Sequence, residues 1–187
     1  MGTDTLTDNR FLAPSADESS EASKFHALKA VAALTVSGVA GRVALQHIPS
    51  VEPLIAVAAA TGFYFGPRYG IAAGGSGYYL SNFLVFGGQG PWTIFQVLGA
   101  GSAGLIGGTL GKASNGRVTF LSSLFVGVAA FELFVNLGSL TFATFTGLGL
   151  SYLVSAFPFT VTHLVSTVGF GLILYGSKER IGLYKYK

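Results

Sequence analysis

The chain has 187 residues, of which 50% are hydrophobic and 10% are charged, with a formal net charge of +3. An average soluble domain carries about 25% charged residues, so this composition excludes a water-soluble globular fold. The absence of cysteine excludes disulfides, thiolate nucleophiles and cysteine-ligated metals. The basic residues do not form a patch interleaved with aromatic side chains, so nucleic-acid binding is not predicted.

The first 24 residues differ from the rest of the chain. They contain five acids, two bases and seven Ser or Thr residues, with almost no periodic apolar pattern. Such a segment cannot bury enough surface to offset the entropy lost on ordering. We therefore predict a disordered cytoplasmic tail over residues 1–24 and a single membrane domain over residues 25–187.

Six continuous apolar runs follow this tail. Most contain about 17 to 25 residues, which at about 1.5 Å per residue spans the ~30 Å hydrocarbon core of a bilayer. The runs cover residues 26–46, 52–65, 69–86, 93–111, 118–138 and 152–176, the second being short. They predict an all-α membrane protein with six transmembrane helices. A membrane β-barrel would instead need alternating strands of about 10 residues.

The distribution of basic residues predicts the orientation of these helices. The connections near 47–51, 87–92 and 139–151 contain no Lys or Arg. Nine basic residues lie instead on the opposite side of the predicted membrane domain: Lys24, Lys29, Arg68, Lys112, Arg117, Lys178, Arg180, Lys185 and Lys187. The positive-inside rule then places both termini in the cytoplasm of a multi-pass cell-membrane protein, and the turn at residues 87–92 outside.

Strongly polar residues within the predicted helices gather in the external half of the bilayer or near its midplane. Polar side chains in a membrane are costly and face the protein interior or water, so this distribution predicts a pocket open to the outside. Glu132 and Asn136 are four residues apart and share one helix face. The predicted ligand-binding residues are Arg42, Gln46, Glu52, Tyr78, Asn82, Gln89, Trp92, Gln96, Glu132, Asn136 and His163.

Structural roles are the alternative for several of these residues. An ion pair at the rim would explain Arg42 with Glu52, and helix capping would explain Asn82 or Gln96. A hydrogen bond to a neighbouring helix would explain His163. Glu132 is harder to explain this way, because a buried carboxylate needs a partner or a proton.

The external turn "GGQGPW" at residues 87–92 is a candidate wall of the pocket. Its glycines allow backbone freedom, and Pro91 stiffens the exit from the turn. Trp92 offers a flat apolar face with one donor at the interface. An ordinary tight turn with a Trp anchored at the headgroups is the alternative.

Small residues form ridges on two of the predicted helices. The fourth run has Ala100, Gly104 and Gly108 on one ridge, with Ala103, Gly107 and Gly111 on the next, and we predict that these pack internally. Small residues at four-residue spacing let helices approach closely in lipid. The first run presents a comparable face, and we predict that it docks a partner protein through Ala33, Ser37, Ala40, Gly41 and Ala44.

Two motifs resemble parts of enzymes. The stretch "GGSG" at 74–77, with His163 on the last helix, resembles the serine and histidine of a rhomboid intramembrane protease. However, Ser76 lies about ten residues before the external end of its helix, and the second run offers no polar group for an oxyanion. The "GGQGP" turn lacks the Lys and the Ser or Thr of a nucleotide-binding loop. No metal-spaced His, Asp or Glu cluster occurs, so we predict no enzyme, metal or cofactor.

Residues 42–112 resemble the substrate-binding S component of energy-coupling factor vitamin transporters. The resemblance rests on "FGPRYG" at 65–70, a glycine-rich third run, the outward "GQGPWT" turn at 88–93 and the glycine-rich fourth run. It implies a six-helix protein that captures a vitamin or related micronutrient at the outer face for uptake. The "GQGPWT" form is most similar to members assigned to cobalamin.

The same resemblance implies partners. An S component assembles with a transmembrane coupling subunit and two cytoplasmic ATPases, and the small residues of its first helix are a typical docking surface. A structural or self-associating membrane protein without a ligand is the alternative from a different functional class.

Overall fold

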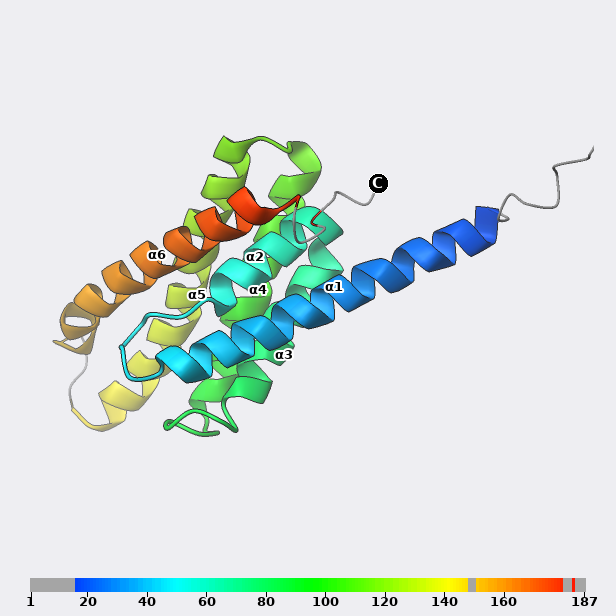
Figure 1. The fold of residues 1–187 in the computed structure, drawn as a ribbon. Helices are drawn as coiled ribbons and strands as arrows, with labels where there is room; N and C mark the ends of the chain where they lie inside the picture. The colour runs from blue at the N-terminus through cyan, green and yellow to red at the C-terminus, as the bar shows by residue number, and fades with distance from the viewer. Residues whose placement is uncertain (1–15, 148–150, 180–182, 184–187) are drawn as a thin grey trace, which may run out of the picture.

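The computed structural model describes residues 16–147, 151–179 and 183. These residues form six α-helices and no strand, which confirms the predicted all-α fold (Figure 1). The helices are α1 (Ala16–Leu45), α2 (Leu54–Phe65), α3 (Pro67–Ser81), α4 (Trp92–Ala113), α5 (Arg117–Phe145) and α6 (Ser151–Ser177).

Several helix boundaries differ from the predicted runs. Residues 16–24, which we expected in the tail, form the first turns of α1, and the rest of that predicted tail lies outside the described residues. The third helix ends at Ser81 rather than near residue 86. Phe83 and Leu84 each donate their N–H to the carbonyl three residues earlier, so tighter turns replace the helix. The fifth helix continues beyond residue 138 to Phe145.

The central helix of the bundle is α2. All twelve of its residues are buried, and it contacts each of the other five helices. Its sequence "LIAVAAATGFYF" explains this position, because it contains no charged residue and many small ones that allow neighbours to approach. The other five helices surround α2 in the order α1, α3, α4, α5 and α6, each packed against the next. The helices α1 and α6 do not pack against each other, so this ring of helices is open on one side.

Direct backbone contact joins α4 to α2 and α3. A Cβ added at Gly104 would meet the backbone of Gly70 on α3, and one at Gly107 would meet the backbone of Ala59 on α2. Small residues that let two helix backbones approach this closely are typical of helices that pack in lipid. The predicted internal packing of the two ridges of α4 is therefore confirmed.

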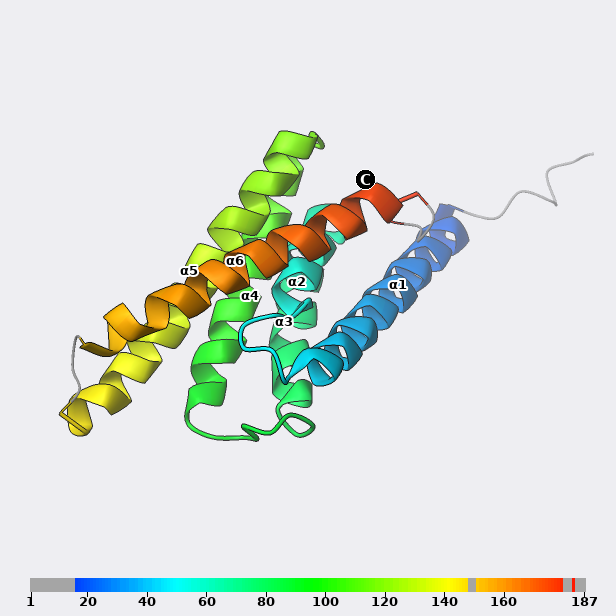
Figure 2. The ribbon, with the colours of Figure 1, turned by 60° about the vertical axis from the view of Figure 1, so that its left-hand side comes forward.

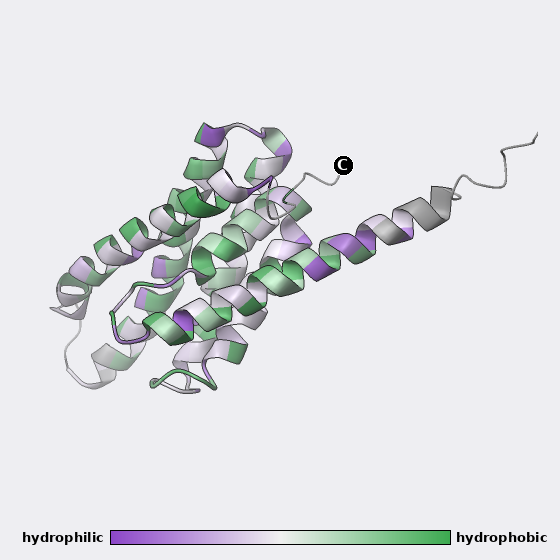
Figure 3. Cartoon of the chain, in the orientation of Figure 1, coloured by the Kyte–Doolittle hydropathy of each residue, from purple (hydrophilic) through white to green (hydrophobic). Residues whose placement is uncertain are grey.

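Four of the helices are long and apolar enough to cross a membrane. These candidate spans are Ser23–Leu45, Trp92–Ala113, Arg117–Phe142 and Ser151–Ser177. The apolar helix α2 has 12 residues and α3 has 15, so each is shorter than the roughly 20 residues that a span needs. Figure 3 shows hydrophobic residues along the helices, and large apolar side chains such as Val36, Phe125 and Val165 are exposed, as expected of a membrane protein.

The start of α1 and the end of α6 lie at the same end of the bundle (Figures 1 and 2). Leu183, which follows α6, is buried in one apolar cluster with Ala27 and Val31 of α1. The other end of the bundle carries three connections, between α1 and α2, between α3 and α4, and between α5 and α6. The candidate site lies at that second end.

Candidate functional site

A cavity of about 500 Å³ opens between the helices at this end of the bundle. Its wall comes from α1, α3, α4, α5 and α6, together with the connections 46–53 and 82–91. The described residues provide both an apolar and a polar lining. The apolar and aromatic part includes Ile48, Val85, Phe86, Trp92, Phe131, Val135, Tyr152 and Phe159.

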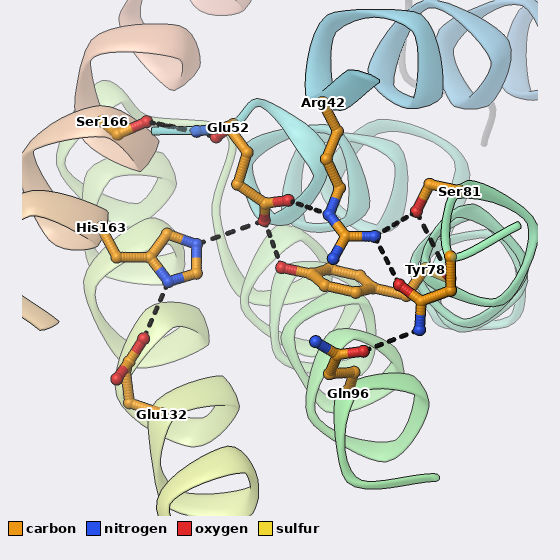
Figure 4. A network of polar contacts seen from close by, with 9 residues as sticks. Arg42, Glu52, Tyr78, Ser81, Gln96, Glu132, His163 and Ser166 are labelled. Atoms are coloured by element: carbon orange, nitrogen blue, oxygen red, sulfur yellow. Dashed lines mark hydrogen bonds and ion pairs between the residues drawn. The ribbon is translucent and has the colours of Figure 1, made fainter. Parts of the chain in front are cut away.

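Glu52 is the centre of a buried polar network at the cavity (Figure 4). It lies near the end of the connection between α1 and α2, and its Oε2 is 2.9 Å from Nε of Arg42. Its Oε1 accepts a hydrogen bond from the Tyr78 hydroxyl and lies 3.3 Å from Nε2 of His163. One carboxylate thus holds together α1, α3 and α6.

The surroundings of Glu52 favour its charged form. Burial raises the pKa of Glu52, but the interactions around the carboxylate outweigh it, those of His163 first and those of Arg42 next. The net effect lowers the pKa below its usual value. The main chain of Glu52 is also held, because its N–H donates to Oγ of Ser166 at 3.0 Å.

A second carboxylate lies on the other side of His163. Nδ1 of His163 is 2.8 Å from Oε1 of Glu132, so the imidazole bridges two carboxylates. Oε2 of Glu132 accepts hydrogen bonds from Thr160 at 2.7 Å and from Nδ2 of Asn136 at 3.1 Å. This arm connects α5 to α6. When the imidazole is protonated, the positive charges of His163 and Arg42 balance the negative charges of Glu52 and Glu132.

The opposite arm of the network runs from Arg42 to α4. Nη1 of Arg42 donates to Oγ of Ser81 and to Oδ1 of Asn82, the latter at 2.8 Å. Nδ2 of Asn82 donates to Oε1 of Gln96 at 2.8 Å and to Oγ1 of Thr93 at 3.1 Å. The guanidinium also stacks on the Tyr78 ring, 4.5 Å from its centroid.

The connections 46–53 and 82–91 contact each other and form the mouth of the cavity. The backbone N–H of Phe86 donates to Oε1 of Gln46 at 2.9 Å, and the ring of His47 packs edge-on against that of Phe86. In the "GGQGPW" turn, the Trp92 ring lies against Gly90, where an added Cβ would collide with it. Trp92 is 42% exposed, so it lies at the mouth rather than in the core.

Ten of the eleven residues predicted to bind a ligand line this cavity. They are Arg42, Gln46, Glu52, Tyr78, Asn82, Trp92, Gln96, Glu132, Asn136 and His163. Gln89 is the exception, because it is exposed and its amide bonds to the carbonyl of Tyr79 and to Thr93 within the turn. The rim ion pair considered for Arg42 with Glu52 does exist, but it is buried and continuous with the rest of the network.

Sequence reasoning missed the hydroxyl residues that complete the network. Thr160 and Ser166 each lie three residues from His163, and Thr93 lies three residues before Gln96. Residues three apart share a helix face. A Ser or Thr at this spacing from a predicted polar residue was therefore the signal that could have found them.

The predicted docking residues of α1 divide into two groups. Ala33, Ser37, Ala40 and Ala44 lie on an exposed face of the helix. Gly41 does not belong with them, because a Cβ added there would come within 2.7 Å of Cγ of Pro53. Its small size serves the packing of the connection against α1, and its docking role stays a prediction.

The serine and histidine of the protease alternative are not paired. The Ser76 hydroxyl is exposed and donates to the carbonyl of Ala72 at 2.6 Å, within its own helix. Both ring nitrogens of His163 face carboxylates instead. Among the described residues, no group of three or more His, Asp or Glu side chains is arranged to hold a metal ion.

Comparison with known proteins provides a family for the chain. No curated protein and no solved structure matches it. A family profile matches residues 22–186, which is most of its length. The chain therefore belongs to the family of unknown function DUF6580.

Proposed function

We propose that this protein captures a small molecule at the outer face of the membrane, as the substrate-binding subunit of an importer similar to the energy-coupling factor transporters. One observation carries the proposal. A cavity of about 500 Å³ at one end of an apolar helical bundle is lined by ten residues, from five helices and two connections, that the sequence predicts to bind a ligand. Polar side chains are costly within a membrane bundle, so their concentration around an open space supports a ligand site.

The size of the cavity narrows the class of ligand. Small-molecule sites typically measure about 300–1,000 Å³, with mostly apolar walls and a few placed polar groups, and this cavity falls within that range. Cobalamin is too large to be enclosed in such a volume. The proposed ligand is therefore a smaller micronutrient.

Mass spectrometry of small molecules that co-purify with the protein tests this function. The expected result is one stoichiometric small molecule that is lost when Trp92 is changed to alanine. A matched preparation of an Arg117→Ala variant, altered at the opposite end of the bundle, should retain it. Purified protein that neither carries nor binds any small molecule would favour a structural or self-associating role.

The proposal includes a topology for the six helices. We place all six within the bilayer, with α2 shielded from lipid by its neighbours and both termini on the cytoplasmic side. The nine basic residues on one side of the predicted topology support this orientation. The location of the start of α1 and the end of α6 at the end opposite the cavity also supports it.

Single-cysteine variants test the orientation in a chain that has no native cysteine. Gly87→Cys, in the exposed turn after α3, should react with a membrane-impermeant thiol reagent added to intact cells. Ser114→Cys, in the exposed connection between α4 and α5, should react only after the cells are opened. The reverse pattern would place the cavity on the cytoplasmic side and contradict uptake from outside.

The exposed small-residue face of α1 is the proposed docking surface for a transmembrane coupling subunit, which would act with two ATPases. We expect Ala40→Leu to weaken this association by about 1–3 kcal/mol, because a larger side chain overpacks a close helix contact. Co-purification with the coupling subunit measures the effect. Ala129→Leu makes the same change on an exposed face of α5 and should leave association intact, and equal effects of the two would show that α1 is not the docking helix.

A further inference from the structure

The charge of Arg42 determines which way the Gln96 amide is oriented, through the side chain of Asn82 that lies between them. An arginine can only donate hydrogen bonds, so Asn82 must present its oxygen to Arg42, as the 2.8 Å contact shows. The nitrogen of Asn82 then faces Gln96, which must accept with Oε1. This leaves Nε2 of Gln96 without a partner among the described residues, as a free donor at the cavity wall.

The direction of the Asn136 amide is determined in the same way from the opposite side of the cavity. An ionised carboxylate can only accept hydrogen bonds. Asn136 must therefore present its nitrogen to Glu132, at 3.1 Å. Its oxygen has no partner among the described residues, so Asn136 contributes a free acceptor to the cavity wall.

These two free groups lie at one level of adjacent, antiparallel helices. A Cβ added at Gly99 of α4 would meet Phe131 of α5, and one added at Gly138 of α5 would meet the ring of Phe95 of α4. Positions 96 and 136 fall between these two contact points on their helices. The free donor and the free acceptor therefore line the same cavity from neighbouring helices, at a similar level of the bundle.

A donor and an acceptor at one level of a cavity complement a molecule that carries an acceptor and a donor along one edge. A cis-amide group, in which a ring N–H adjoins a ring carbonyl, has this pattern. Flat apolar side chains stand close to these groups, because Trp92 is four residues before Gln96 on the same face of α4. Trp92 and Phe159 both line the cavity, where they can cover the faces of a ring.

The charges of the cavity disfavour an anionic ligand. Its lining contains two carboxylates, Glu52 and Glu132, against Arg42 and one histidine. Arg42 is already in an ion pair with Glu52 and stacked on an aromatic ring. No surplus positive charge is left for a carboxylate or phosphate group.

We propose that the cavity binds an uncharged, planar heterocycle with a cis-amide edge, whose carbonyl accepts from Gln96 and whose N–H donates to Asn136. This assignment rests on the proposed function, capture of a small molecule, and specifies the chemical class that is captured. Pyrimidinones and fused pyrimidinones are heterocycles of this class.

Three bicyclic probes of similar size test the assignment by ligand-observed NMR on the full chain in lipid nanodiscs, with empty nanodiscs subtracted. They are 4(3H)-quinazolinone, its 3-methyl derivative without the N–H, and the anion quinoline-4-carboxylate. The unmethylated quinazolinone should bind about tenfold or more tightly than the other two, because each of these leaves a cavity group unpaired or adds an unmatched charge. Equal binding of the methylated probe, tighter binding of the carboxylate, or no binding of any probe would overturn the assignment.

Variants locate the contact. Asn136→Leu, which is similar in size but cannot accept a hydrogen bond, should remove the preference for the unmethylated probe. Gln89→Met, a change in an amide outside the cavity, should preserve it, and a preference that persists in Asn136→Leu would contradict the assignment. The wild-type comparison is decisive even if Asn136→Leu does not fold. A co-purifying molecule without a cis-amide edge would overturn the assignment and leave the capture function intact, whereas neither a molecule nor probe binding would overturn both.

Discussion

Replacing Glu52 with alanine is expected to destabilise the protein by about 3–5 kcal/mol, the range measured when one partner of a buried ion pair is removed. The change leaves the guanidinium of Arg42 without its ion-pair partner and the hydroxyl of Tyr78 without its acceptor. It also removes one of the two carboxylates that face His163. Glu52 thus connects α1, α3 and α6.

Thermal unfolding of the purified protein measures this effect, and a loss of that size corresponds to a fall in Tm of roughly 10 °C. Glu21→Ala is a suitable control, because Glu21 is exposed on the first half of α1. Glu52→Gln should fall between the two, since its amide keeps an acceptor for Tyr78 but loses the charge that pairs with Arg42. An unchanged Tm in Glu52→Ala would show that the network does not stabilise the bundle.

Introducing a side chain at Gly104 is expected to prevent assembly of the bundle. A Cβ at this position would collide with the backbone of Gly70, which cannot move aside as a flexible side chain can. The helices α3 and α4 would have to separate, at a cost of about 3 kcal/mol or more. We expect Gly104→Val to lose most of its monodisperse protein in fluorescence-detected size-exclusion chromatography.

The matched control for this change is Gly169→Val on α6. A Cβ added at Gly169 meets nothing within 4 Å, so the same substitution in another apolar helix should be tolerated. Equal yields of folded protein from the two variants would mean that α3 and α4 do not pack as closely as described.

The sequence was sufficient to predict the helices and most of the polar residues that line the cavity, because both follow from the cost of placing polar groups in lipid. Arg42, Glu132 and His163 stand out in apolar runs, and such residues must converge to find partners. The same argument could not separate Gln89 from the lining residues. Its exclusion depends on the conformation of a turn in which its amide satisfies neighbouring groups.

Details that depend on three-dimensional packing were less accessible. Composition does not show that Gly41 faces Pro53, because a glycine on a small-residue face suits either an internal or an external contact. The length of α2 was predicted correctly as short, but its location at the centre of the bundle depends on contacts with every other helix. The end of α3 at Ser81 could not be predicted either, because apolar residues such as Phe83 and Leu84 suit both a helix and the tight turns that they form.

The open order of helices around α2 has a consequence for how a molecule could enter or leave the cavity. Because α1 and α6 make no contact, this side of the bundle can widen without separating a pair of packed helices. At the cavity end it is bridged by the connection that carries Glu52, through its hydrogen bonds to Ser166 and its ion pair with Arg42. Releasing Glu52 costs about 3–5 kcal/mol, whereas dividing a helix interface forfeits many packing contacts at once. Beside the open mouth, the seam between the first and last helices is therefore where the cavity can widen most easily, and the interactions of a single residue, Glu52, hold it at this end.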